Sequence, residues 1–129
     1  MGYGMSQTDS SFFIAKKDRA KVKKAINALM SRASATRDGK FRWVDTSTVL
    51  DARTVDEQFE EWRWSTEYDD EGNIVDLVHD GEKMGDDIEL FKAIAPHVKP
   101  GSFIDMMGED GNDWRWYFDG ATCLVHDPD

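Results

Sequence analysis

The stretch DWRWYFDGATCLVHD, residues 113–127, sets two runs of strand-favouring residues on either side of an Asp-Gly pair. Asp-Gly between alternating apolar residues favours a two-residue hairpin turn, and a turn at Asp119 and Gly120 places Trp116 opposite Cys123. Because successive side chains of a strand point to opposite faces, one face then carries Trp114, Trp116, Phe118, Cys123 and Val125. The other face carries Arg115, Tyr117, Thr122, Leu124 and His126. We therefore predict an antiparallel hairpin whose two Trp side chains lie in the core.

Apolar residues recur at helical or strand spacing along the rest of the chain and predict its other elements. Amphipathic helices are expected over 19–33, 55–62 and 88–95, and a helical turn over 45–52. A capping box of Thr54 and Glu57 precedes the second of these helices. Further strands are expected at 10–15, 41–44, 65–70, 73–80 and 102–107. The order, roughly β-α-β-α-β-β-α-β-β-β, predicts one α+β domain over residues 1–129, with a mainly antiparallel sheet and two to three helices packed on one face.

The charge of the chain is strongly negative and unevenly distributed. Sixteen Lys and Arg against 26 Asp and Glu give a formal net charge of −10, which disfavours general affinity for nucleic-acid backbones. Residues 1–50 hold ten basic and four acidic side chains, and residues 51–129 hold six basic and 22 acidic ones. Two interpretations stay open: the basic half is one solvated helix face, or the acidic half faces a partner protein with a basic surface.

Composition and motifs limit the cellular compartment in which the protein is expected and the metal, cofactor and catalytic sites that it can form. Cys123 is the only cysteine, so it forms no internal disulfide and no cysteine metal site, which predicts a cytoplasmic protein. No apolar run approaches the roughly 20 residues of a membrane span, so no membrane association is expected. The chain has no phosphate-binding glycine loop, zinc-type His/Cys cluster or nucleophile motif. We therefore expect no metal and no cofactor, and the sequence leans against an enzyme without deciding the question.

Most of the candidate binding residues lie near the C-terminal hairpin. Arg115, Tyr117 and His126 share its polar face, where they are able to contact solvent or a ligand. Glu109 and Asp110 lie in the acidic loop GEDGND that precedes it. Turn formation alone also accounts for Asp, Asn and Gly in that loop, and its spacing does not match a calcium-binding loop.

A further candidate, Arg63, belongs to an earlier Trp-Arg-Trp at 62–64. The segment 61–80, EWRWSTEYDDEGNIVDLVHD, continues like the C-terminal hairpin with an acidic turn and Leu-Val-His-Asp. The spacing between Trp-Arg-Trp and Leu-Val-His-Asp differs in the two copies, and the first copy is expected to begin on a helix. Duplication of a hairpin and coincidence both remain open as its origin.

Short segments spread over nearly the whole chain resemble the sequences of one protein family. They include SSFFIAKK (10–17), LFKAIAPHV (90–98), GSFIDMMGEDG (101–111) and WRWYFDG (114–120). In these pieces the chain resembles a family of small, uncharacterised bacterial and phage proteins, whose best signature is GEDG, two residues and then WRWYFDG. The resemblance implies a single domain of cytoplasmic or phage-encoded origin, and it carries over no activity, ligand or catalytic residue.

Three functions follow as hypotheses. The first is an acidic interaction module, in one version a phage-encoded modulator of a basic host protein, whose binding weakens as salt screens the charges. The second is a small-molecule or nucleotide-related enzyme that brings Arg63, Arg115, Tyr117 and a His/Asp pair into one cleft. The third is nucleic-acid binding through the basic helix that begins at Arg19.

Overall fold

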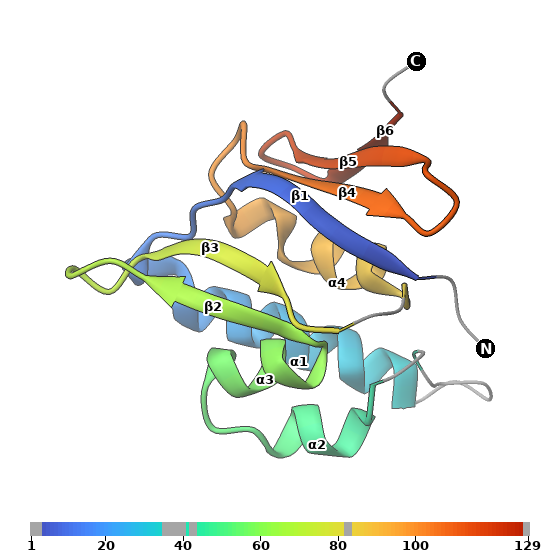
Figure 1. Ribbon diagram of the computed structural model, residues 1–129. Coiled ribbons are helices and arrows are strands. Elements are labelled where there is room, and N and C mark those ends of the chain that lie inside the picture. Colours follow the sequence, from blue (N-terminus) through green and yellow to red (C-terminus); the bar gives the residue numbers. More distant parts are fainter. Residues whose placement is uncertain (1–3, 35–40, 42–43, 82–83, 128–129) are drawn as a thin grey trace.

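The computed structural model describes residues 4–34, 41, 44–81 and 84–127 of the 129-residue chain (Figure 1). Its strands are β1 (Met5–Ser11), β2 (Trp64–Tyr68), β3 (Ile74–His79), β4 (Phe103–Gly108), β5 (Asp113–Phe118) and β6 (Cys123–His126). Its α-helices are α1 (Arg19–Ser34), α2 (Thr46–Asp51), α3 (Val55–Glu61) and α4 (Asp87–Ile94), and short 3-10 turns, η1 (Lys16–Asp18) and η2 (Ala95–His97), precede α1 and follow α4. The chain is an α+β fold with antiparallel sheets, and the order of its elements roughly matches the predicted order.

The strands form two sheets that lie side by side. One has the order β1-β4-β5-β6 and the other pairs β2 with β3; in Figure 1, α4 lies below the four-stranded sheet and α1 runs behind β2 and β3. Gln7 of β1 joins the sheets, because its amide donates to the carbonyl of Leu77 at 2.9 Å and its oxygen accepts from the N–H of His79 at 2.7 Å. Ile14 and Ile74 add a backbone bridge with N–H···O distances of 2.8 and 2.9 Å. The side-chain and backbone bonds together align the two sheets.

One aromatic cluster forms the centre of the core. Phe91 of α4 is fully buried and packs edge-on against Trp64, Trp116 and Phe118, with ring centroids 5.3, 5.0 and 5.7 Å away. Trp64 belongs to β2 and the other two to β5, so Phe91 contacts both sheets at once. Each aromatic side chain in such a core buries on the order of 150–250 Å². The cluster therefore ties α4 and the two sheets into one core.

The β5–β6 hairpin has the predicted faces but a different register. Phe118 pairs with Cys123, and Trp116 pairs with Val125, a shift of two residues from the predicted pairing. Because side chains alternate with a period of two, this shift leaves each of them on its predicted face. Trp114 and Trp116 accordingly lie in the core, at 8% and 1% exposure.

The position of the turn explains the shift in register. The N–H of Asp119 donates to the carbonyl of Thr122 at 3.2 Å, which centres the turn on Gly120 and Ala121. The carboxylate of Asp119 accepts from the N–H groups of Ala121 and Thr122 at 2.9 and 2.8 Å. Gly120 takes the positive φ of 97° that the first central position requires. Asp119 therefore acts as the residue before the turn rather than as its first central residue.

Side chains cap the starts of α3 and α2. The hydroxyl of Thr54 accepts from the N–H of Glu57 at 3.2 Å, and the Glu57 carboxylate accepts from the N–H of Thr54 at 3.3 Å. This reciprocal pair is the predicted capping box of α3. At α2, the carboxylate of Asp45 accepts from the N–H of Thr48 at 3.2 Å. These bonds satisfy backbone N–H groups that a helix start leaves unpaired.

Two strand predictions differ from the structure. The first strand covers Met5–Ser11 instead of residues 10–15, because Phe12 and Ile14 turn into the core after the strand has ended. The strand expected at 41–44 is not formed at Phe41 or Val44, and residues 42–43 lie outside the described residues. Short aromatic runs favour strands by propensity, but packing decides whether a partner strand is within reach.

Candidate interaction surface

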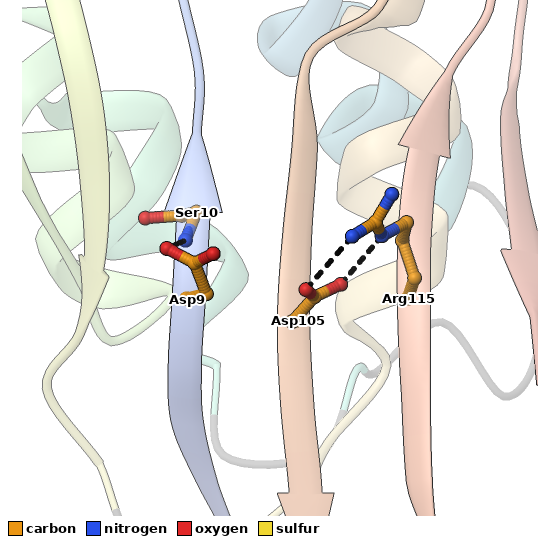
Figure 2. A network of polar contacts seen from close by, with 4 residues as sticks. All are labelled: Asp9, Ser10, Asp105 and Arg115. Atoms are coloured by element: carbon orange, nitrogen blue, oxygen red, sulfur yellow. Dashed lines mark hydrogen bonds and ion pairs between the residues drawn. The ribbon is translucent and has the colours of Figure 1, made fainter. Parts of the chain in front are cut away.

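A polar row crosses the face of the four-stranded sheet that points away from α4. Strand register aligns Asp9, Asp105, Arg115 and His126 on β1, β4, β5 and β6. Arg115 donates from Nε and Nη2 to the two carboxylate oxygens of Asp105, at 2.7 and 3.0 Å (Figure 2). Its guanidinium also lies 4.0 Å from the ring centroid of Phe103. Donation of these hydrogen bonds to the Asp105 carboxylate raises the pKa of Arg115, and the resulting ion pair links β4 and β5.

Tyr117 and His126 lie next to this ion pair. Their rings stack at a centroid distance of 5.5 Å and an interplanar angle of 14°, and Leu124, which pairs with Tyr117, is 40% exposed. An open hollow of about 370 Å³ reaches from Arg115 and His126 to the ends of β5 and β6. The structure therefore brings Arg115, Tyr117 and His126 together on one accessible face.

Glu109 and Asp110 lie in the turn between β4 and β5. The carboxylate of Glu109 accepts from the N–H of Gly4, and the N–H of Glu109 donates to the carbonyl of Gly4 at 2.8 Å. Asp110 accepts from the backbone N–H and the side-chain amide of Asn112 at 3.2 and 2.9 Å. Both carboxylates make contacts that stabilise the turn, and Glu109 also fixes the segment that leads into β1.

Arg63 lies apart from the hairpin residues, between α3 and β2. It has a positive φ of 70°, and its carbonyl accepts from the N–H of Asp80 at 2.8 Å. Its guanidinium packs against Gly81, where a Cβ atom would come within 3.1 Å of Arg63 Cζ. The arginine of the first Trp-Arg-Trp therefore adjoins the two-stranded sheet, while Arg115 lies within the four-stranded one.

A buried polar cluster near Arg63 is a feature that sequence reasoning missed. Asp87 is 2% exposed and accepts from the indole N–H of Trp64 at 2.9 Å. The ring of His79 packs on Trp64 at 4.8 Å, and neither of its buried nitrogens has a hydrogen-bond partner among the described residues. Burial lowers the pKa of His79, and the Arg63 cation lowers it further. The carboxylates of Asp87 and Asp80 act in the opposite direction. This shift favours the neutral form of the His79 ring.

An apolar groove on the α4 side of the sheet is the second feature that sequence reasoning missed. It lies between the start of α4 and the ends of β5 and β6, and its volume is about 830 Å³. The apolar side chains that line it are Met84, Ile88, Trp114, Trp116 and Val125. Val125 is 52% exposed, the most of any large apolar side chain described. Groove volumes of this order accommodate several side chains of a ligand.

Two acidic residues form the rim of this groove, where it meets the hollow on the polar face of the sheet. Asp113 begins β5 and Asp127 follows β6, and both are exposed. Asn112 and Gly111 complete this end of the groove. The sequence pattern assigned Val125 correctly to the apolar face, but periodicity carries no information on how far α4 reaches under that face. We call the apolar side chains and this rim together the acidic groove.

The acidic groove adjoins an open sheet edge. β6 is the last strand of its sheet, and within the described residues no strand pairs with its outer side. Its sequence, Cys-Leu-Val-His, contains none of the Lys or Pro residues with which proteins commonly protect exposed edges. The groove and the edge meet at Val125, which belongs to β6 and lines the groove.

The fold and this surface define a small α+β protein with an acid-rimmed apolar groove beside an open strand. Comparison with known protein families, with curated proteins and with solved structures finds no match. No helix in the described part of the chain is long and apolar enough to cross a membrane. Over the same residues, no group of three or more His, Cys, Asp or Glu side chains is placed to hold a metal ion.

Proposed function

We propose that the chain is an interaction module that binds a basic segment of a partner protein in the cytoplasm. The observation that carries this proposal is the acidic groove, with its apolar floor, its carboxylates Asp113 and Asp127 and its place on a chain of net charge −10. Apolar contact supplies affinity in such a site, and complementary charge supplies the on-rate and the choice of partner. The likeness to phage proteins adds a concrete version, a phage-encoded modulator of a basic host protein.

The alternative hypotheses have less support in the geometry. The proposed enzyme cleft needs Arg63 beside Arg115 and Tyr117, but Arg63 adjoins the two-stranded sheet, and the other two lie in β5 of the four-stranded sheet. Arg115 is also engaged by Asp105 through two hydrogen bonds. On the basic helix, Lys21 and Lys24 are exposed on a solvated face, as expected for any amphipathic surface helix.

A pair of labelled peptides tests the proposal. The probe is the acetylated and amidated heptapeptide KVKVKVK, and EVEVEVE is its charge-reversed control. Fluorescence anisotropy at low salt is expected to show binding of the Lys peptide only. The affinity is expected to fall as NaCl rises through about 0.1 M, where the screening length is about 10 Å.

Charge variants assign this binding to the acidic groove. Asp113→Asn combined with Asp127→Asn is expected to weaken KVKVKVK binding about three- to tenfold, as for the loss of two exposed ion pairs. Glu67→Gln combined with Glu71→Gln removes the same charge from exposed positions in β2 and in the turn between β2 and β3 and serves as the matched control. Equal weakening by both double variants, or binding of both peptides alike, would contradict the proposal.

A further inference from the structure

We infer that β6 binds the partner segment as an added strand, which places alternate side chains of that segment in the acidic groove. This inference rests on the proposed function and specifies its ligand: an extended peptide with apolar residues at every second position and basic residues between them. Main-chain hydrogen bonds to an open strand supply affinity in this mode of recognition, and pockets for alternate side chains supply specificity. Three features of β6 support it.

The backbone of β6 is oriented for pairing on its outer side. The N–H of Phe118 donates to the carbonyl of Ser102 at 2.9 Å, and the carbonyl of Phe118 accepts from the N–H of Gly101 at 2.8 Å. Both groups of Phe118 therefore point toward the segment that enters β4 and away from β6. Its partner Cys123 then sits in a non-hydrogen-bonded pair, and in an antiparallel ladder such pairs alternate with hydrogen-bonded ones. The N–H and C=O groups of Cys123 and Val125 consequently face the open edge.

The side chains next to that edge match the groove. Cys123 and Val125, whose backbone groups face the edge, also point their side chains to the α4 side of the sheet. Cys123 is buried at 1% exposure, whereas Val125 is 52% exposed in the groove wall. An added strand therefore covers Val125 with a residue that points the same way, because directly opposed residues share a face. Ile88 and Met84 line the opposite side of the space that this residue enters.

Charge decides between a partner segment and a second copy of the chain. The rim carries Asp113 and Asp127. A second copy would bring its own described segment 122–127, TCLVHD, which contains Asp127 and no Lys or Arg. Such a copy would add an acidic side chain and no basic one to a surface that is already acidic, and like charges repel. A segment that alternates apolar and basic residues avoids this repulsion.

Backbone methylation of the probe tests strand addition without altering the protein. One KVKVKVK peptide is N-methylated at its three valines and a second at three of its lysines, and each is compared with the unmodified peptide by anisotropy. In antiparallel pairing the groove-facing valines are the residues that hydrogen-bond to Val125. The valine-methylated peptide is then expected to bind about tenfold or more weakly, while the lysine-methylated peptide stays within about threefold.

The outcomes separate this inference from the proposed function. Loss of binding by only one of the two methylated peptides supports strand addition. Loss by the valine-methylated peptide indicates antiparallel pairing, and loss by the lysine-methylated peptide indicates parallel pairing. Equal effects of the two methylations overturn strand addition, and the proposed function stands if the unmodified peptide still binds in a salt-dependent way. Failure of the unmodified peptide to bind overturns both. As a check on the face, Val125→Gln is expected to weaken binding about tenfold or more, and Leu124→Gln, the same uncharged change on the opposite face of β6, is expected to leave it within about threefold.

Discussion

Truncation of Phe91 in α4 is the perturbation that best tests the account of the core. The side chain is fully buried and makes edge-on contacts with Trp64, Trp116 and Phe118. Replacement of a buried Phe by Ala costs about 3–5 kcal/mol in the free energy of unfolding. Phe91→Leu keeps most of the apolar volume and loses three aromatic contacts of about 0.5–1.5 kcal/mol each. We therefore expect a loss of about 4 kcal/mol for Phe91→Ala and about 2 kcal/mol for Phe91→Leu.

Urea denaturation measures this difference directly. Unfolding is followed by far-UV circular dichroism, which reports on the whole backbone, and by Trp fluorescence, which reports on the aromatic cluster. The two transitions are expected to coincide in both variants, because Phe91 contacts both sheets and the core unfolds as one unit. Lys92→Ala, an exposed change one residue along the same helix, is expected to stay within about 0.5 kcal/mol of the parent chain. A loss below about 1 kcal/mol for Phe91→Ala, or separate transitions for the two probes in the parent chain, would refute the reasoning.

Three further predictions concern side chains outside this cluster. The thiol of Cys123 is buried, and its pKa is raised to about 12. It is therefore expected to react with a disulfide reagent at pH 8 only as fast as the chain unfolds. Rapid reaction of the folded chain would show that the thiol is accessible. The pKa of His79 is lowered from 6.5 by burial. As the pH falls, the His79 ring is therefore protonated in the unfolded chain before it is protonated in the folded chain. The free energy of unfolding is consequently expected to decline below about pH 6.5. His79→Leu is expected to flatten the dependence between about pH 7.5 and 5.5, and an unchanged slope in urea titrations would assign it to other groups. A double-mutant cycle on Arg115→Ala and Asp105→Ala is expected to give a coupling free energy of about 0.5–1 kcal/mol that shrinks with salt, and a coupling that is zero or insensitive to salt would contradict the exposed ion pair.

The sequence predicts local structure in this chain because local structure rests on near neighbours. Thr54 and Glu57 are three residues apart, so their capping box is visible without any tertiary information. The faces of the β5–β6 hairpin depend only on alternation, and for that reason they survive a two-residue change of register. The register itself depends on the hydrogen bonds of one carboxylate, Asp119, to two N–H groups. Asp-Gly fits either turn position, so composition alone does not select between them.

The candidate site was harder to predict because it is formed by distant segments. The pattern correctly gathers Arg115, Tyr117 and His126 on one face, since all three lie within a single hairpin. The acidic groove instead joins Met84 to Val125, which are brought together only by the packing of α4 under the sheet. The joining of β1 to β3 by Gln7 has the same origin, since its partners lie 70 and 72 positions away. Neither periodicity nor turn chemistry carries information on such pairings.

Amide hydrogen exchange in β6 tests the central claim most directly. The rates at Cys123, Leu124 and Val125 are measured by NMR with and without saturating KVKVKVK peptide. The N–H groups of Cys123 and Val125 face the open edge, while that of Leu124 already faces Tyr117 across the hairpin. The account predicts that the peptide slows exchange at Cys123 and Val125 by about tenfold or more and changes Leu124 less. Equal slowing at all three amides, or none at Cys123 and Val125 while the peptide is bound, would contradict it.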